Sequence, residues 1–344
     1  MIDPEKVKRV LIFRTGSLGD TVVALPCFHL IARSFPQAEK RILTARTFNP
    51  RAVTLTAVLE NSGLIDDFIY YSSNQKMKDL PRVWKQIRSW APDVFIYLAA
   101  PRGLFSAWRD AAFFKLCGIK RFIGVPYTKS LQENQWLSDQ KVFEHESERL
   151  GRCLKELGDI RIGDPRSWDL HLTGVEKKSA EERLQNWPGK KMFIVSSVVP
   201  KVKTKDWGEE NWSRLFGQLS ENYPDLGMVM IGAQVDAEPS ERIARQWKGP
   251  FLNLCGVLNV RESAAVIQKA LFFLGHDSGP MHLAASLRVS CVAVFCHPKK
   301  PDVWFPYGNG HRVLISENHG RSPLQTEGLL TAVQELLEKN PEKR

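Results

Sequence analysis

The sequence has no long hydrophobic run. No apolar stretch reaches the roughly 18 to 20 residues that a membrane-spanning helix needs. The first residues, MIDPEKVKRVLIF, lack the charged, apolar and small-residue regions of a secretory signal peptide. We therefore expect a cytoplasmic protein.

Two common nucleotide-binding fingerprints are also missing. The glycine-rich turn TGSLGD at residues 15–20 contains neither the Gly-x-x-x-x-Gly-Lys-Ser/Thr of a P-loop nor the Gly-x-Gly-x-x-Gly of a dinucleotide-binding fold. The second absence argues against an NAD-dependent oxidoreductase. Binding of NAD in place of a nucleotide sugar would restore that alternative.

Cysteine is sparse and scattered, without a Cys-x-x-Cys pair. This spacing favours buried, reduced thiols over a structural metal site or a disulfide framework. The six are Cys27, Cys117, Cys153, Cys255, Cys291 and Cys296.

Charge is biased towards the basic side. The formal net charge is +10, and residues 1–160 carry +7 of it. Nucleic acid, an anionic membrane surface and a phosphorylated substrate all suit such a chain. The excess is diffuse and is not interleaved with an aromatic platform, which disfavours nucleic acid as the partner.

Short β-rich runs alternate with helical patterns through both halves of the 344 residues. This alternation predicts parallel strands joined by helical crossovers, and the length favours two domains. The pattern lapses in a Gly-, Pro- and Asp-rich stretch within 158–189, followed by a helix at 175–187. The expected strands are 8–13, 41–45, 66–71, 93–99 and 120–125, then 191–197, 227–233, 251–256, 270–276 and 289–295.

Two such α/β halves predict a cleft that faces the carboxyl ends of both sheets, where ligands of open parallel sheets bind. The last segment, 322–344, reads as an amphipathic helix with a charged end.

The segment FFLGHDSGPMHLAASL, residues 272–287, is the most informative. A strand ends at His276, and Pro280 suits the first position of a helix. Ser278 and Gly279 then lie at a helix entrance, where free N–H groups and the helix dipole favour a phosphate. His282 would lie in the first turn, and Asp277 could bind sugar hydroxyls. A serine cap and a packed histidine are the ordinary alternative.

Polar residues follow two other strands of this half. Ser196 and Ser197 end one strand, and a loop with three lysines follows. Hydroxyl and ammonium groups can together neutralise a diphosphate without a metal ion. After the next strand, Asp236 or Glu238 could bind ribose hydroxyls, although an acid-rich helix start explains them equally well. Together these features predict a nucleotide diphosphate site.

The turn TGSLGD ends in an acid at the start of a helix. We expect Gly16 and Gly19 to keep the turn free of side chains, so that another molecule can approach. Asp20 would then face the diphosphate site and take a proton from an acceptor hydroxyl. A helix cap is the alternative reading of Asp20.

These residues resemble glycosyltransferase family 9, the bacterial heptosyltransferases of lipopolysaccharide core assembly. The resemblance covers most of the chain and rests on VLIFRTGSLGDTVVALP, KTKDWGEENWSRL, GHDSGPMHLAASLRVSCVAVF and PDVWFPYG. It implies a GT-B fold. It assigns residues 1–165 to an acceptor-binding domain, 166–322 to a donor-binding domain, and 323–344 to a helix that returns to the first domain.

The resemblance also implies an inverting, metal-independent and cofactor-independent sugar transfer, usually from ADP-L-glycero-D-manno-heptose. The general base falls on Asp20. The donor-binding residues fall on Ser196, Ser197, Lys205, Asp236, Asp277, Ser278, Gly279 and His282.

Two departures from the family pattern stand out. The loop from Ser197 to Lys205 is longer than expected, which leaves Lys201 and Lys203 as alternatives to Lys205. Cys296 replaces a frequent glycine near the donor pocket.

The acceptor side transfers least well. Its implied partner is an anionic glycan or glycolipid, with peripheral association at the cytoplasmic face of the inner membrane. Another nucleotide sugar, a different surface glycan, a secondary metabolite, or a non-catalytic nucleotide-sugar binder stay open as alternatives. The acceptor-side residues proposed here are Arg14, Gly16, Ser17, Gly19, Arg102 and Arg121, with Arg46, Arg51, Arg109, Lys120 and Lys129 as further basic residues.

Overall fold

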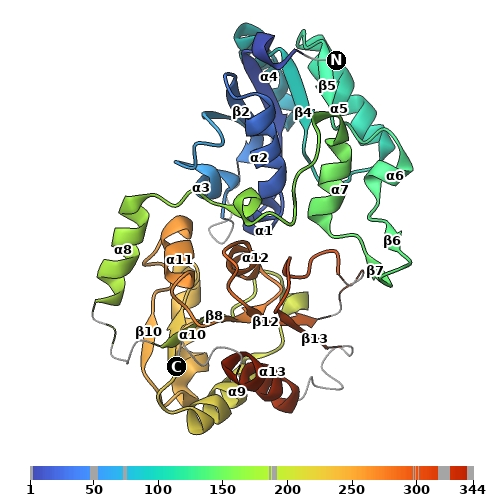
Figure 1. Cartoon of the computed structure of the whole chain (residues 1–344). Helices are drawn as coiled ribbons and strands as arrows, with labels where there is room; N and C mark the ends of the chain where they lie inside the picture. The colour runs from blue at the N-terminus through green and yellow to red at the C-terminus, as the bar shows by residue number, and fades with distance from the viewer. Residues whose placement is uncertain are drawn as a thin grey trace. The chain divides into compact units, whose positions relative to one another are not determined.

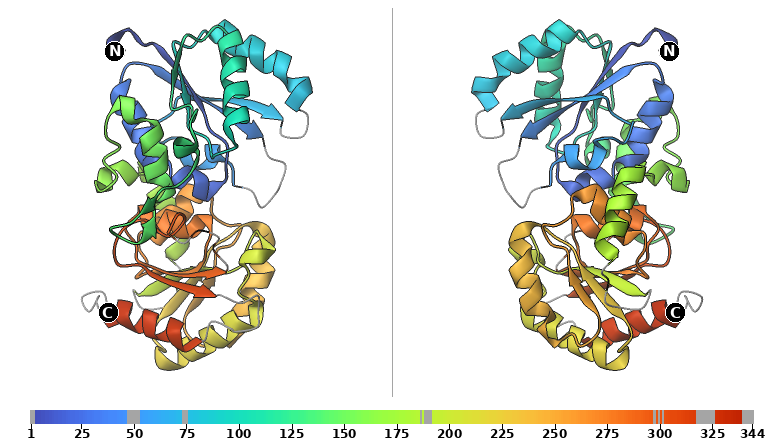
Figure 2. Two further views of the ribbon diagram at one scale, coloured as in Figure 1. Left: turned by 90° about the vertical axis from the view of Figure 1, so that its right-hand side faces the viewer. Right: turned by 90° about the vertical axis from the view of Figure 1, so that its left-hand side faces the viewer.

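The computed structural model describes residues 3–46, 53–72, 76–185, 187, 192–296, 298, 300, 302–316 and 326–338. The chain divides into two compact units, Met1–His171 and Leu172–Arg344 (Figure 1). The division falls close to the expected boundary at residue 165. In each unit, helices cover both faces of a parallel sheet (Figure 2).

The N-terminal unit is built on a five-stranded parallel sheet in the order β3-β2-β1-β4-β5. The order reverses between β1 and β4, and a crevice forms at the carboxyl ends of the strands at such a reversal. All five strands were expected from the sequence. They are β1 (Arg9–Phe13), β2 (Glu39–Arg46), β3 (Asp67–Ser72), β4 (Val94–Tyr97) and β5 (Arg121–Ile123).

Seven α-helices are described in this unit, together with an antiparallel hairpin that the sequence pattern did not indicate. Its two strands have only two residues each, too short for a period-2 pattern. The hairpin strands are β6 (Trp136–Leu137) and β7 (Val142–Phe143). The helices are α1 (Leu18–Val22), α2 (Leu25–Ser34), α3 (Leu55–Leu59), α4 (Lys76–Trp90), α5 (Leu104–Leu116), α6 (Lys129–Gln132) and α7 (Glu146–Cys153).

The C-terminal unit has a six-stranded parallel sheet in the order β10-β9-β8-β11-β12-β13, which reverses between β8 and β11. Five strands match the expected runs, and β13 was not expected. The strands are β8 (Phe193–Ser197), β9 (Gly227–Met230), β10 (Phe251–Asn253), β11 (Phe273–His276), β12 (Cys291–Cys296) and β13 (Arg312–Ser316).

The first helix of this unit packs against α11 through a buried ion pair between Glu176 and Arg261. A buried pair of this kind fixes the packing because loss of either partner leaves an uncompensated charge. The helices are α8 (Gly174–Leu184), α9 (Glu209–Asn222), α10 (Ala237–Ile243), α11 (Val260–Ile267), α12 (Gly279–Ser286) and α13 (Thr326–Glu338).

The position of α13 corrects one expectation. Leu329, Val333 and Leu336 are buried in one core with Trp212 and Phe216 of α9, and α13 lies beside α9 in Figure 1. This helix therefore packs on the C-terminal unit, whereas we expected residues 323–344 to pack on the N-terminal domain. An amphipathic pattern predicts that one face of a helix is buried and does not specify the partner. Residues 323–325 and 339–344 lie outside the described residues.

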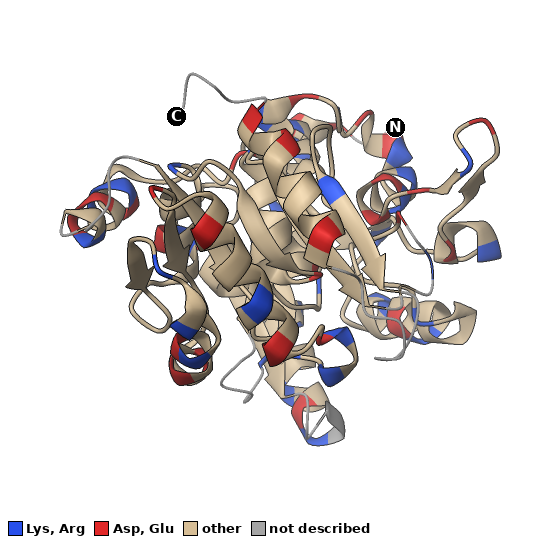
Figure 3. Ribbon diagram, turned by 90° about the horizontal axis from the view of Figure 1, so that it is seen from below, with Lys and Arg blue, Asp and Glu red and all other residues tan. Residues whose placement is uncertain are grey.

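No helix among the described residues is both long and apolar enough to cross a membrane. All six cysteines are free thiols, and Cys27, Cys117, Cys255 and Cys291 are buried. Seen from below, basic and acidic residues are interspersed along the helices (Figure 3).

Candidate functional site

The turn from β1 into α1 is held by the carboxylate of Asp20. Its Oδ2 accepts hydrogen bonds from the backbone N of Ser17 at 2.7 Å and from Ser17 Oγ at 2.8 Å. Ser17 is the N-cap of α1, so the two residues form a capping box. Asp20 is partly exposed, and no described residue donates a hydrogen bond to its Oδ1. One carboxylate oxygen thus fixes the turn and the other stays open.

Gly16 has a different role from the expected one. A Cβ atom at this position would lie 2.4 Å from Cβ of Asp20 and 2.8 Å from its Cγ, and φ is +145°. Only glycine tolerates both the contact and this backbone conformation. The Asp20 side chain occupies the position that a side chain at residue 16 would take. Gly19 is buried within α1.

Arg14 lies in the interior, although we expected it on the acceptor side. One guanidinium nitrogen donates to the carbonyl of Leu98 at 2.7 Å, and the other donates to the carbonyl of Asp20. Burial lowers the pKa of Arg14, while the charges of Asp20 and Glu146 oppose that shift. The residue joins the end of β4 to the start of α1 and positions the Asp20 turn.

The other two arginines expected on the acceptor side lie at opposite ends of the strands. Arg102 follows β4, forms an ion pair with Asp110, and donates to the hydroxyl of Tyr97 at 3.0 Å. Its guanidinium lies 5.1 Å from the ring centre of Phe13, the last residue of β1. Arg102 therefore lies at the carboxyl ends of the strands, and its acceptor-side role stays a prediction. Arg121 begins β5, so it lies at the amino ends of the strands, where it forms an ion pair with Glu156. This corrects its assignment to the acceptor site.

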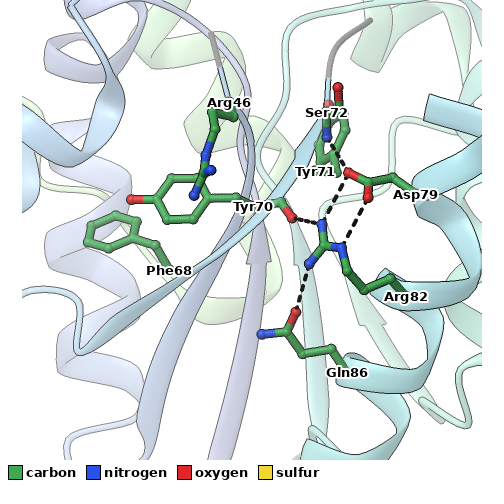
Figure 4. Close-up of a pocket in the computed structure, with 8 residues that line it drawn as sticks. All are labelled: Arg46, Phe68, Tyr70, Tyr71, Ser72, Asp79, Arg82 and Gln86. Atoms are coloured by element: carbon green, nitrogen blue, oxygen red, sulfur yellow. Dashed lines mark hydrogen bonds and ion pairs between the residues drawn. The ribbon is translucent and has the colours of Figure 1, made fainter. Parts of the chain in front are cut away.

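A pocket of about 360 Å³ opens at the carboxyl ends of β2 and β3 (Figure 4). The guanidinium of Arg46 lies 5.2 Å from the ring centre of Tyr70. Arg82 forms an ion pair with Asp79 and donates to the carbonyl of Tyr70 at 2.6 Å. Arg46 is among the basic residues expected on the acceptor side. Arg51 lies outside the described residues.

In the C-terminal unit, an ion pair marks the reversal of strand order. Nζ of Lys205, at the end of a short 3-10 helix, lies 2.5 Å from Oδ2 of Asp277, which follows β11. Burial raises the pKa of the Asp277 carboxyl, and the Lys205 ammonium opposes that rise. Lys201 and Lys203 are exposed, and neither forms an ion pair with a described residue. Of the three lysines, Lys205 is the one held at the strand ends.

His276 holds the Lys205 loop in place, a role that sequence reasoning missed. Its buried Nε2 accepts hydrogen bonds from the backbone N of Trp207 at 3.1 Å and from Nε1 of Trp212 at 2.9 Å. Burial and the nearby charge of Lys205 lower the pKa of His276 to about 3. The imidazole is therefore neutral, with its proton on Nδ1. The two tryptophans that follow the lysine loop were the signal in the sequence from which this role of His276 could have been predicted.

The entrance of α12 has an unused polar group. Ser278 is the N-cap, yet its Oγ is buried and makes no hydrogen bond with any described residue. An N-cap hydroxyl ordinarily bonds a free N–H of the first turn. Gly279 begins the helix, and His282 is buried with its ring centre 6.1 Å from that of Trp304. The predicted residues Asp277, Ser278 and Gly279 thus form the connection from the end of β11 to the start of α12.

The two serines at the end of β8 differ in exposure. Ser196 is fully buried, and its hydroxyl donates to the carbonyl of Leu274 in β11 at 2.8 Å. Ser197 is partly exposed at the end of β8. Successive strand residues point to opposite faces, so the two hydroxyls cannot both reach a ligand. The structure corrects the expectation that they act as a pair.

Asp236 repeats the arrangement of Asp20. Its Oδ2 accepts from the backbone N of Ala233 at 2.9 Å, and a Cβ atom on Gly232 would lie 3.1 Å from Cβ of Asp236. The hydrogen bond that Asp236 accepts at this helix start therefore agrees with the alternative reading of an acid-rich helix start.

Cys296 is partly buried at the end of β12, and burial with the charges of Asp206 and Asp277 raises its pKa to about 11. Among the described residues, no group of three His, Cys, Asp or Glu side chains converges as metal ligands would.

Two doubly wound parallel sheets, one in each unit, are the architecture of the GT-B fold. The family model of glycosyltransferase family 9 (heptosyltransferase) matches residues 81–330. The chain belongs to this family and is a glycosyltransferase.

Individual relatives agree. The chain is 23% identical over 310 residues to the lipopolysaccharide core heptosyltransferase OpsX of Haemophilus influenzae, covering 89% of this chain and 83% of the relative. The crystal structure of a family 9 glycosyltransferase from Veillonella parvula has a TM-score of 0.75 at 17% identity and covers 99% of both chains. The structure of the Escherichia coli ADP-heptose lipopolysaccharide heptosyltransferase II has a TM-score of 0.68 at 18% identity, covering 97% of this chain and 99% of the other. At these identities the two structures show the fold.

Proposed function

We propose that this glycosyltransferase moves L-glycero-D-manno-heptose from ADP-heptose to a hydroxyl of a lipopolysaccharide inner-core acceptor, with inversion and without a metal ion. The family and the names of the relatives support the sugar and the acceptor. Activity on a different nucleotide sugar or glycan, and nucleotide-sugar binding without turnover, are the alternatives that the experiment below separates.

The observation that carries the proposal is the group of residues at the β8–β11 reversal. The Ser278 hydroxyl is buried without a partner, and the Lys205 ammonium is held by Asp277 at the same strand end. Buried polar groups are normally satisfied, so an orphan hydroxyl at a helix entrance beside a cation fits a ligand with anionic oxygens. A nucleotide diphosphate has this chemistry.

The proposed reaction is a single displacement. The acceptor oxygen forms a bond to the anomeric carbon while the bond from that carbon to the diphosphate oxygen breaks, and ADP leaves. The proton of the acceptor hydroxyl passes to Asp20, whose Oδ1 accepts no hydrogen bond from the described residues. Lys205 and the N–H groups at the start of α12 offset the charge that develops on the leaving diphosphate.

Asp20→Asn tests the general base. An asparagine oxygen can still accept the two hydrogen bonds from Ser17, so the turn is retained while the base is removed. We expect unchanged affinity for ADP-heptose and a loss of transfer of roughly a hundredfold or more. Isotope-labelled heptose transfer to a purified core acceptor gives the rate, and calorimetry gives the affinity.

Glu262→Gln is the matched control, because Glu262 also accepts a backbone N–H in a capping box, that of Asn259 at 2.8 Å. It should leave transfer unchanged. Transfer by Asp20→Asn at nearly the parent rate would show that Asp20 only caps α1.

A thermal-shift panel of ADP-heptose, ADP, GDP-mannose, UDP-N-acetylglucosamine and NAD identifies the donor, since a ligand of the folded state raises Tm. Preference for another nucleotide would contradict the proposed sugar.

A further inference from the structure

The helix α5 is apolar on its outer side. Phe105 is 80% exposed, Trp108 60% and Leu116 71%. An α-helix turns by about 100° per residue, so these positions form one stripe. The opposite side of α5 is buried through Ala107, Ala111 and Phe114. A surface helix ordinarily presents charged residues across its solvent side, whereas this stripe on α5 consists of large apolar residues.

Neighbouring aromatic residues widen the stripe. Trp84 of α4 is 39% exposed, and its Nε1 donates to the carbonyl of Leu116 at 3.1 Å. The ring of Tyr127, 36% exposed, lies 4.4 Å from that of Trp108 between centres. We define the α5 face as Trp84, Phe105, Trp108, Leu116 and Tyr127. Exposed apolar groups that adjoin one another mark an interaction site more often than isolated ones do.

Cations border the α5 face. Residues 104–129 contain five lysines and arginines and one acid, Asp110, which is paired with Arg102 and Arg109. At helical spacing, Arg109 and Lys115 fall on opposite borders of the stripe. Lys115 and Lys120 also line a hollow of about 640 Å³ together with Trp108 and Tyr127. The surface therefore combines large apolar side chains with ammonium and guanidinium groups around them.

We propose that the α5 face binds the surface of an anionic phospholipid bilayer. Phe105, Trp108 and Leu116 would enter the boundary between headgroups and acyl chains, where aromatic rings are favoured. Lys115 and Lys120 would lie at the lipid phosphates, attracted by the negative surface potential. A symmetric contact with a second copy is disfavoured, because it would bring two basic borders together. The inference rests on the proposed function in one respect, that a lipid-linked acceptor lies in such a bilayer.

Vesicle sedimentation of the full chain, without donor or acceptor, tests this surface. The protein should bind vesicles of phosphatidylcholine with phosphatidylglycerol and not vesicles of phosphatidylcholine alone. The double variant Phe105→Ser/Trp108→Ser should reduce the partition coefficient by roughly tenfold or more. Lys115→Gln/Lys120→Gln should reduce it by a similar factor and weaken its salt dependence.

Two controls match these variants. Val175→Ser removes an apolar side chain that is 79% exposed on α8, and Lys178→Gln removes an exposed lysine of the same helix. Both should bind vesicles like the parent. Parent-like binding by the α5 variants, or no binding by the parent, would overturn the inference. Concentration-dependent dimerisation that Phe105→Ser/Trp108→Ser abolishes would identify a second copy as the occupant instead.

Failure of the proposed function is distinguishable, because vesicle binding needs no sugar transfer. The variant Phe105→Ser/Trp108→Ser should also retain transfer to a delipidated acceptor, which bypasses the bilayer. Loss of that transfer would place the α5 face in substrate binding and contradict a membrane role.

Discussion

The ammonium of Lys205 and the carboxylate of Asp277 are 2.5 Å apart at the reversal of strand order in the C-terminal sheet. The two residues are far apart in sequence and lie at the ends of different segments, one in the loop after β8 and the other after β11. Asp277 therefore holds the cation that we assign to the diphosphate.

Asp277→Asn should weaken ADP and ADP-heptose binding by the same factor, roughly tenfold, the size expected for one charge-assisted hydrogen bond. The reason is that Lys205 loses its anchor whether or not the sugar is present. Calorimetric titration with both nucleotides measures the effect. If ADP affinity is unchanged and only ADP-heptose binding weakens, Asp277 contacts the sugar and does not position Lys205. The double variant with Lys205→Met should be no weaker than Lys205→Met alone.

Gly16→Ala should lower the transfer rate by roughly a hundredfold, because the new Cβ displaces the Asp20 carboxylate. Donor affinity should not change. Gly63→Ala is the control: φ is +71° there, but nothing lies within 4 Å of the new atom. Both variants place a side chain at a positive φ, and only the first moves Asp20. Equal rates in the two variants would remove Gly16 from the positioning of Asp20.

His276 makes stability depend on pH in a defined direction. Its pKa is lowered to about 3 in the folded chain, from an ordinary value of 6.5. The unfolded chain therefore binds the extra proton between these values, and the contribution of His276 is full above pH 6.5 and declines as the pH falls towards 3. In His276→Gln, Tm should decline less between pH 7 and pH 5 than in the parent.

Between pH 7 and pH 5 ordinary carboxyl groups change their protonation little, so they contribute little to the change in Tm. The other histidines are present in both proteins, so their contribution cancels in the comparison. Weaker ADP binding should accompany the substitution, because Trp207 loses the acceptor that fixes the Lys205 loop. An identical pH dependence of Tm in both proteins would argue against a neutral, buried His276.

The sequence predicted the turns better than the roles of individual side chains. The ends of β8 at Ser197 and of β11 before Asp277, and the start of α1 before Asp20, lie where the alternation placed them. Hydrophobic periodicity and glycine position are local signals. The position of Arg14 could not be predicted, because its burial depends on a carbonyl that follows β4, far along the chain. The same is true of Ser196, whose partner lies on a neighbouring strand.

By itself, the sequence determined two parallel α/β units, the Asp-Ser-Gly-Pro turn that starts a helix, and membership of a glycosyltransferase family. The first two follow from composition and short-range spacing, which each segment carries alone, and the third follows from the resemblance of its motifs to the family. Only the tertiary structure decided which charges are paired, that Asp20 fills the space above Gly16, and that α13 packs on the C-terminal unit. Such contacts join distant segments, and their energies depend on burial and geometry that exist only once the sheets have formed.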